Sequence, residues 1–110
     1  MTPILAALLI CTSPGVIDGD TLRCSDGTRI RLWGIDAPER SDPAGPGSTR
    51  ALSRTITGQT LTCERKGKSY NRIVARCWIG RTDVASEMVR QGQVADWPRF
   101  SHGAYTAPRK

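Results

Sequence analysis

Apolar and polar residues alternate between residues 29 and 35, where Ile30 and Leu32 are separated and preceded by arginines. A period of two is that of a strand with one buried face. Two turn sequences, Asp-Gly-Asp at 18–20 and Ser-Asp-Gly-Thr at 25–28, divide this part of the chain into three apolar-rich segments. The pattern therefore predicts a three-stranded antiparallel meander.

The spacing changes after a Pro- and Gly-rich loop at residues 41–48, which ends at Ser48, a predicted helix N-cap. Apolar residues then recur at helical spacing as far as a stop at Gly58. They form a stripe of Ala51, Leu52, Thr55 and Ile56. A second helix is predicted between Asp83, as its N-cap, and Gly92, as its stop.

Between the two helices, residues 59–65 and 72–79 have the composition of strands, joined by a loop rich in Lys, Gly, Ser and Asn. Five short strands with an interposed helix favour a mainly β, α+β fold. The predicted architecture is a small five-stranded, closed OB-type barrel with two packed helices.

Residues 1–10 contain an uncharged apolar run that is too short to span a bilayer, so stable membrane insertion is not expected. The run is either a truncated signal segment or a first strand. With 110 residues the chain has the size of one domain. The 16 basic and 10 acidic residues give a net charge of +6, which favours a polyanionic partner.

Four cysteines and a single histidine make a zinc site improbable, since no two cysteines form a CxxC pair. Cys63 and Cys77 flank a predicted hairpin, and Cys11 and Cys24 flank the Asp-Gly-Asp turn. We therefore predict the disulfides Cys11–Cys24 and Cys63–Cys77, which imply an oxidising compartment and export. The alternative is four reduced, buried thiols.

Five of the ten acidic residues fall between positions 18 and 39 of this basic chain. Alternate turns of a meander lie at opposite ends, so Asp20 and the residues after the third strand, Asp36 and Glu39, can share one rim. Carboxylate oxygens gathered there suit a hard cation such as Ca²⁺. Arg31 and Arg72 beside them could clamp a phosphoryl group. The alternative is that the acids form turns and the arginines are ordinary surface residues.

Four segments, in order and at matching spacing, resemble the staphylococcal nuclease (thermonuclease) family. They are Val-Ile-Asp-Gly-Asp-Thr at 16–21, Arg-Ile-Arg-Leu-Trp-Gly-Ile-Asp-Ala-Pro-Glu at 29–39, Tyr-Asn-Arg-Ile-Val-Ala at 70–75 and Glu-Met-Val-Arg-Gln-Gly at 87–92. The cysteine positions are similar to those of a disulfide-bearing bacterial subgroup of exported relatives. The resemblance places the nuclease-like domain at residues 11–100 and leaves 101–110 as a short tail.

The resemblance implies Ca²⁺-dependent cleavage of DNA and RNA, single-stranded or frayed, with little sequence specificity and with 3′-phosphate ends. Asp20, Asp36 and the backbone carbonyl of Ala37 would bind the Ca²⁺. Arg31 and Arg72 would hold the scissile phosphate, and Glu39 would position or deprotonate the attacking water. These roles are consistent with metal-assisted hydrolysis.

Two further residues are expected to contact substrate: Tyr70, by the resemblance, and Lys68, as part of a basic loop. We expect Trp33 and Trp78 to pack against the fold, and Trp97 is a candidate for the edge of a nucleotide pocket. The chain departs from the family's best-known member in Ala37, which replaces a Thr, and from the family in a third, C-terminal helix that is expected to be missing.

Two other functions fit parts of the sequence. A non-catalytic OB-type nucleic-acid-binding module would share the fold, and a small disulfide-stabilised interaction protein would explain the cysteines and the charge. Neither explains why Glu39 and Arg72 accompany the carboxylates. A monomer suffices for each of these functions.

Overall fold

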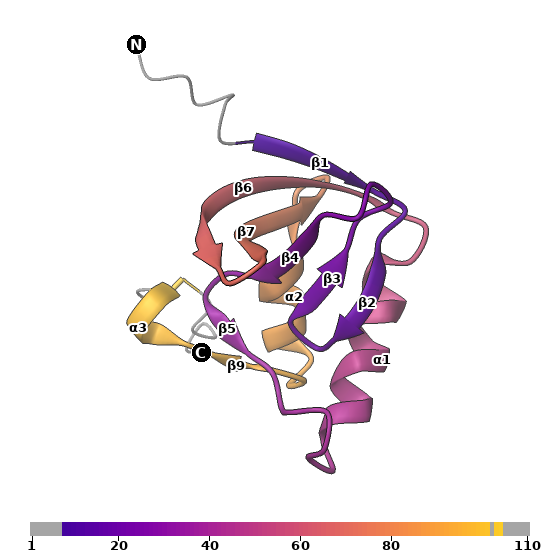
Figure 1. Cartoon of the computed structure of the whole chain (residues 1–110). Coiled ribbons are helices and arrows are strands. Elements are labelled where there is room, and N and C mark those ends of the chain that lie inside the picture. Colours follow the sequence, from indigo (N-terminus) through magenta and orange to yellow (C-terminus); the bar gives the residue numbers. More distant parts are fainter. Residues whose placement is uncertain (1–7, 102, 105–110) are drawn as a thin grey trace.

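The computed structural model describes residues 8–101 and 103–104, so the predictions for residues 1–7 and for most of the tail lie outside the described residues. Its architecture is a curved, mainly antiparallel sheet with two helices packed against it (Figure 1). The mainly β, α+β fold with two packed helices is confirmed.

The predicted meander forms as expected. It consists of β2 (Gly15–Asp18), β3 (Thr21–Arg23) and β4 (Arg29–Leu32), paired antiparallel in that order. Leu22 lies opposite Ile30, and both side chains are fully buried. The alternation read from the sequence therefore sets which face of these strands packs into the core.

The following hairpin is longer than predicted. Strand β6 (Thr60–Ser69) pairs antiparallel with β7 (Arg72–Ile79), so the segment expected to be a Lys/Gly/Ser/Asn loop is mostly strand, and that prediction is wrong. A bulge between Arg65 and Gly67 absorbs one residue and lets the pairing continue to the hairpin tip. There Tyr70 adopts the left-handed conformation, with φ of 56°.

The main sheet has the order β1-β6-β7-β4-β3-β2, with β4 and β7 running parallel and β1 (Leu8–Thr12) pairing antiparallel with β6. Within the described residues, β1 and β2 are the two edges of the sheet and do not pair with each other. Hydrogen bonds between the described strands therefore do not close the barrel, and the prediction of a closed barrel is wrong in this respect. The chain joins the two edges through a corner at Ser13 and Pro14, where Ser13 has φ of 46°. Proline has no N–H to donate, which ends the pairing of β1 at this corner.

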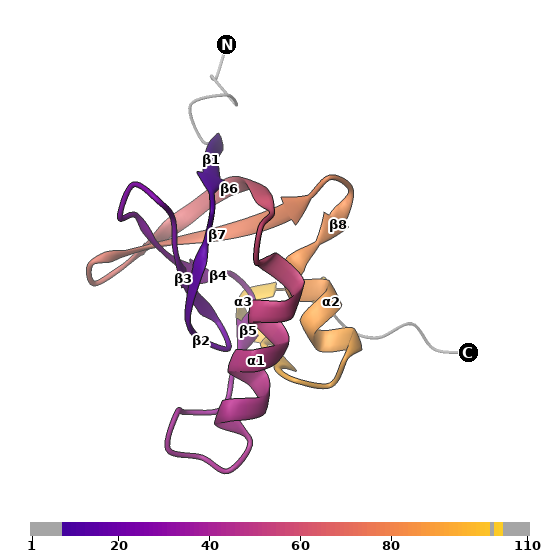
Figure 2. The ribbon, with the colours of Figure 1, turned by 90° about the vertical axis from the view of Figure 1, so that its right-hand side faces the viewer.

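Helices α1 (Gly45–Ile56) and α2 (Val84–Arg90) lie side by side against the sheet (Figure 2). Asp83 caps α2 as predicted, since its carboxylate accepts a hydrogen bond from the Ser86 N–H. The predicted cap of α1 is wrong. This helix begins one turn earlier, because Pro46 suits a first helical turn, and Ser48 lies inside it.

Short elements complete the fold. Strand β8 (Thr82–Asp83) extends the edge of β7, and β5 (Ile35–Asp36) pairs antiparallel with β9 (Ala95–Asp96). Beyond these, the described residues add only α3 (Pro98–Ser101), a single helical turn. Of the C-terminal tail, Ser101 is buried and Gly103 and Ala104 are exposed.

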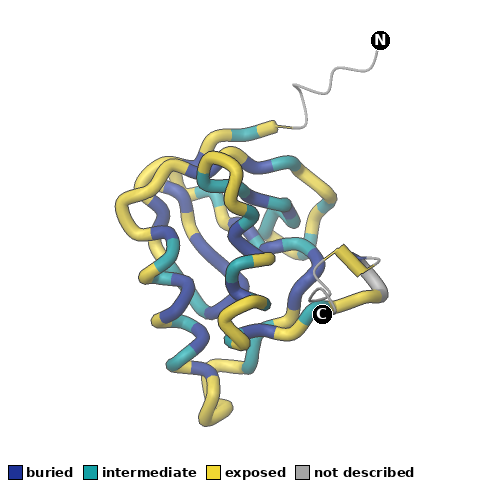
Figure 3. Tube along the Cα trace, turned by 180° about the vertical axis from the view of Figure 1, so that it is seen from behind, coloured by how far each residue is buried: buried dark blue, intermediate teal, exposed yellow. Residues whose placement is uncertain are grey.

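The hydrophobic core lies between the sheet and the two helices, where the buried residues of α1 face those of the meander (Figure 3). Both predicted disulfides are present, and all four cysteines are buried. Cys63 and Cys77 are directly opposite each other on β6 and β7, and Cys11–Cys24 joins β1 to the residue after β3. The disulfides thus link the edge strand β1 to the meander and the two strands of the long hairpin to each other.

We expect removal of the Cys63–Cys77 disulfide, in a Cys63→Ala/Cys77→Ala variant, to lower the free energy of unfolding by about 3 kcal/mol, because the bond closes a loop of 14 residues in the unfolded chain. Urea unfolding monitored by tryptophan fluorescence measures the change. Dithiothreitol should destabilise the wild type more than the variant. Equal destabilisation of the two proteins would contradict this assignment.

Ser48 is fully buried, and its hydroxyl has no hydrogen-bond partner in the structure. A Ser48→Ala substitution should therefore raise the free energy of unfolding by about 1 kcal/mol, since it removes an unsatisfied polar group and introduces a better helix former. Ser53→Ala is the control. Its hydroxyl is paired with Thr57 at an exposed site, and its effect should stay within about 0.5 kcal/mol.

Candidate active site

The Asp18-Gly19-Asp20 turn and the segment that leaves β4 meet at one rim of the sheet, as predicted. The turn packs tightly against α1. A Cβ atom built on Gly19 would lie 1.9 Å from the Ser48 hydroxyl oxygen and 2.9 Å from the Ala37 Cβ. Only glycine fits this approach, and the packing fixes the turn beside the strand that carries Asp36.

A pocket of about 270 Å³ opens at this rim. Six of the residues predicted from the sequence line it: Asp20, Arg31, Asp36, Ala37, Glu39 and Arg72. Asp18 and Pro38 complete the lining. The pocket is thus made of charged side chains brought together from four separate segments of the chain.

Asp20 is the buried member of the acidic group. One of its carboxylate oxygens accepts a hydrogen bond from the Ala37 N–H at 3.0 Å, and the other from the Thr21 hydroxyl at 3.0 Å. Burial raises the pKa of Asp20 above its usual value; the Arg31 guanidinium opposes the shift, and neighbouring Asp18 reinforces it. Keeping this carboxylate ionised therefore lowers the free energy of unfolding of the protein.

Arg31 is fixed on several sides. Its Nη1 donates to the backbone carbonyls of Leu32, at 2.7 Å, and Ile35, at 2.9 Å. Its Nη2 lies 3.4 Å from a carboxylate oxygen of Asp20 and 3.7 Å from one of Asp36. The two carboxylates therefore share one guanidinium nitrogen, and the strand carrying Arg31 sets the distance between them.

Arg72 reaches the same pocket from β7, which is the parallel neighbour of β4. Its Nη1 lies 3.4 Å from the Thr21 hydroxyl, and its Nη2 donates to the Ser69 hydroxyl at 3.1 Å. Hydroxyl groups are weak partners for a guanidinium, so an anion entering the pocket would bind Arg72 more strongly than they do.

Glu39 is exposed at the mouth of the pocket, on the segment between β5 and α1. Its backbone carbonyl accepts the Asp42 N–H at 2.9 Å, which closes a turn and holds the residue at the mouth. This gives Glu39 access to both solvent and pocket, as a group that accepts a proton from water requires.

Asp18 was missed as a site residue in the sequence, where it is read as a turn former. Its Oδ1 does accept the Asp20 N–H at 3.2 Å, as a turn former would, but the residue also lines the pocket. The signal available in the sequence was its position two residues before Asp20, on the same tight turn.

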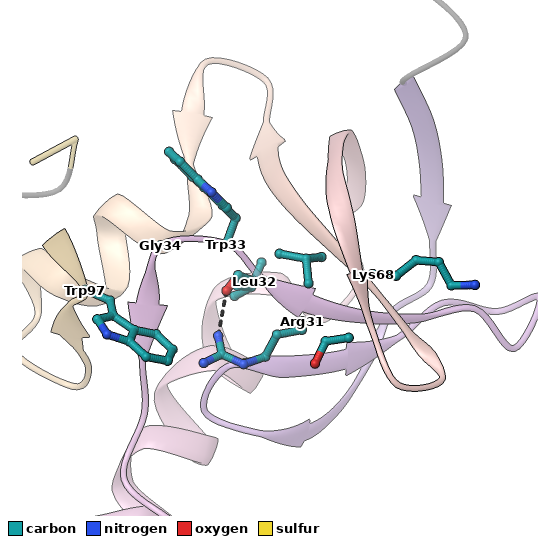
Figure 4. Close-up of a pocket in the computed structure, with 8 residues that line it drawn as sticks. Arg31, Leu32, Trp33, Gly34, Lys68 and Trp97 are labelled. Atoms are coloured by element: carbon teal, nitrogen blue, oxygen red, sulfur yellow. Dashed lines mark hydrogen bonds between the residues drawn. The ribbon is translucent and has the colours of Figure 1, made fainter. Parts of the chain in front are cut away.

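A second pocket of similar volume adjoins Arg31 (Figure 4). Lys68 and Trp97 line it together with Trp33, Gly34 and other residues, and the Arg31 guanidinium carbon lies 5.9 Å from the centroid of the Trp97 ring. Tyr70 lines neither pocket. It stands at the hairpin tip with 94% of its surface exposed.

The donor set of the charged pocket fits a hard cation, since its acidic side chains offer carboxylate oxygens and no described His, Cys or Met side chain lines it. Within the part of the chain that the structure describes, no three His, Cys, Asp or Glu side chains are arranged to hold a metal by themselves. A cation here would need oxygen ligands from the backbone and from water besides the carboxylates.

No helix in the described ranges is long and apolar enough to cross a membrane.

Comparison with known proteins agrees with this geometry. The model of the family "Staphylococcal nuclease homologue" matches residues 29–103. An "Uncharacterized endonuclease" of Haemophilus influenzae is 34% identical over 97 residues, which cover 84% of this chain and 54% of the relative. An "Uncharacterized endonuclease" of Escherichia coli is 34% identical over 95 residues, or 82% of this chain and 62% of the relative.

A yeast relative, the "Probable endonuclease LCL3" of Meyerozyma guilliermondii, is 43% identical over 74 residues, which cover 57% of this chain and 32% of the relative. The chain thus spans about half the length of its Haemophilus relative and a smaller share of the yeast one. Because the family match covers well over half of the chain and includes Arg31, Asp36, Glu39 and Arg72, the chain belongs to the family of staphylococcal nuclease homologues.

Proposed function

We propose that this protein is a Ca²⁺-dependent nuclease that hydrolyses phosphodiester bonds of DNA and RNA, single-stranded or frayed, with little sequence specificity. The observation that carries the proposal is the single pocket in which Arg31, Arg72 and Glu39 meet the carboxylates of Asp20 and Asp36. A binding module without catalysis would need the arginines but would have no use for an exposed carboxylate at the pocket mouth.

In this proposal Asp20, Asp36 and the Ala37 carbonyl hold Ca²⁺, which would supply positive charge to a bound phosphate oxygen. Arg72 exchanges its hydroxyl partners for the phosphate, and Arg31, held in the pocket by two carbonyls, provides a second positive charge beside it. Both guanidiniums stabilise the negative charge that grows as phosphorus becomes five-coordinate.

Glu39 accepts a proton from the attacking water. The water oxygen forms a bond to phosphorus while the bond from phosphorus to the 5′-oxygen breaks. That oxygen takes up a proton from solvent water and leaves as a 5′-hydroxyl, so the other product carries a 3′-phosphate. The exposure of Glu39 allows the proton to pass on to solvent.

The second pocket is the place for the nucleotide next to the scissile phosphate, with Trp97 as an aromatic wall and Lys68 for a phosphate. Tyr70 is exposed at the tip of the hairpin that also carries Arg72, and from there it would contact the nucleic-acid strand. The two buried disulfides support export to an oxidising compartment, where the protein would act as a monomer.

The proposal predicts that cleavage of single-stranded DNA requires Ca²⁺ and stops in EGTA. Glu39→Gln should lower kcat by about 10²–10⁴-fold, as expected for loss of a general base, and Arg72→Ala by about 10²–10³-fold. Gel analysis of a labelled oligonucleotide measures both effects and identifies the product ends. Arg54→Ala, at an exposed position of α1, is the matched control and should leave the rate unchanged. Cleavage that persists in EGTA would rule out the metal requirement.

Asp20 should also limit stability. Because its pKa is raised in the folded state, the ionised carboxylate favours the unfolded chain at neutral pH, and this cost disappears once the group is protonated in both states. Asp20→Asn should therefore raise the free energy of unfolding at pH 7. The gain should shrink as the pH falls through the folded-state pKa. Urea titrations of both proteins at pH 7 and pH 4, in EDTA, test this. A gain that grows toward low pH would contradict it.

A further inference from the structure

Four side chains form a layered stack on the outer face of the sheet. Only one of them, Trp33, also lines one of the two pockets described above. The Lys66 amine lies 4.8 Å from the centroid of the Trp33 ring, and the Arg76 guanidinium carbon 5.4 Å from it. The same guanidinium carbon lies 5.4 Å from the Trp78 ring. We call Lys66, Trp33, Arg76 and Trp78 the outer stack.

The strands place these side chains on one face. On β7, Arg76 and Trp78 alternate with Ala75 and Cys77, whose side chains are buried. Trp33 follows the buried Leu32, which lies opposite Ala75 across the parallel β4–β7 pair. The alternation that buries one set of residues therefore directs the outer stack away from the core.

Acidic neighbours orient the two cations of the stack. Asp83, opposite Trp78 on β8, accepts from the Arg76 Nε at 2.7 Å, and Glu64, opposite Arg76, lies 3.2 Å from the Lys66 amine. The side chains of Arg76 and Lys66 remain 29% and 31% exposed. The cations are thus held in place and still reach the surface.

The part of the chain that carries Lys66, Arg76 and Trp78 is strongly basic. Residues 60–83, from β6 to β8, contain six basic and two acidic residues, a net of +4 out of the +6 of the whole chain. Arg65, Lys68 and Arg72 on β6 and β7, and Arg81 in the turn before β8, are the other four basic residues. A polyphosphate is the partner that this charge complements.

The outer stack is continuous with the proposed active site. Trp33 belongs to it and also lines the second pocket, together with Arg31, Lys68 and Trp97 (Figure 4). In that view Trp33 and Trp97 lie on different sides of the chain that leaves β4. Trp33 is thus shared by the second pocket and the outer stack, so a nucleic-acid strand bound in that pocket lies next to the stack.

We propose that the outer stack is a further binding site for single-stranded nucleic acid, which takes the nucleotides that extend beyond the second pocket; this rests on the proposed nuclease function. Phosphates of the extending strand contact Lys66 and Arg76, and a base stacks on the indole of Trp78. Such a surface of cations and aromatic rings binds strands with little sequence preference. The protein then favours long single strands over short ones.

The test compares the binding of 4-nucleotide and 12-nucleotide oligothymidylates, labelled with fluorescein, by fluorescence anisotropy in Ca²⁺. Binding is measured in a Glu39→Gln background, so that the strands are not cleaved. Lys66→Ala and Trp78→Leu should each weaken binding of the 12-mer by about fivefold or more and leave the 4-mer unchanged. Lys66→Ala should also reduce the slope of log Kd against log salt by about one, for the 12-mer only.

Arg54→Ala removes the same charge from α1 and should change neither Kd. Thermal unfolding identifies any variant whose loss of affinity comes from loss of folding, and the exposed Lys66 keeps the test decisive if Trp78→Leu is unstable. Folded variants that retain the full affinity for the 12-mer would overturn the outer-stack site. Failure of the background protein to bind either oligonucleotide, together with no cleavage by the wild type, would overturn the nuclease function itself.

Discussion

The position of the Arg31 guanidinium is the constraint on which the rest of the site depends. Two backbone carbonyls hold one of its nitrogens, and the carboxylates of Asp20 and Asp36 share the other. A planar, always charged group with a fixed fork can make these contacts simultaneously, whereas a lysine amine would supply one point charge. The meander, the β4–β5 segment and the acidic turn are thereby held in one arrangement.

Burying the Asp20 carboxylate in this arrangement lowers the free energy of unfolding at neutral pH. A carboxylate at position 20 is buried beside another acid, and the arginine only partly offsets the loss of hydration. Sites that must bind a cation or a phosphate are preorganised at the expense of stability in this way. The close approach of Gly19 to Ser48 and Ala37 leaves the acidic turn no room for a larger side chain on that side.

Stability is recovered elsewhere. A chain of this size has a modest core, and the sheet has open edges at β1 and β2. The disulfides connect the edge strand β1 with the meander and the two strands of the long hairpin with each other. The hairpin matters to the site because it carries Arg72, Lys68 and Tyr70, and its outer face carries the stack of cations and indoles. The hairpin, cross-linked by its disulfide, therefore positions Arg72 in the charged pocket and Lys68 in the lining of the second pocket.

The sequence by itself determined the elements whose signals are local. Alternation gave the meander, Asp83 and Gly92 bounded the second helix, and the cysteines flanking the turns gave the correct disulfides. Predictions from the sequence were wrong where two local signals compete. Ser48 resembles a helix cap, but Pro46 already starts the helix. The polar segment before Tyr70 resembles a loop, but pairing with β7 extends it as a strand.

Only the tertiary structure decided how the charged residues meet. Asp18 and Glu39 are far from Arg72 in the sequence, and their common pocket follows from the parallel β4–β7 pair, which no periodicity encodes. The outer stack was invisible for the same reason: Trp33 and Trp78 lie 45 positions apart in the chain, yet both lie against Arg76. Sequence patterns report which face of an element is buried, because that depends on neighbours one or two residues away. Which elements lie side by side depends on packing across the whole fold, so the place of Asp18 in the pocket and the outer stack appear only once the chain has folded.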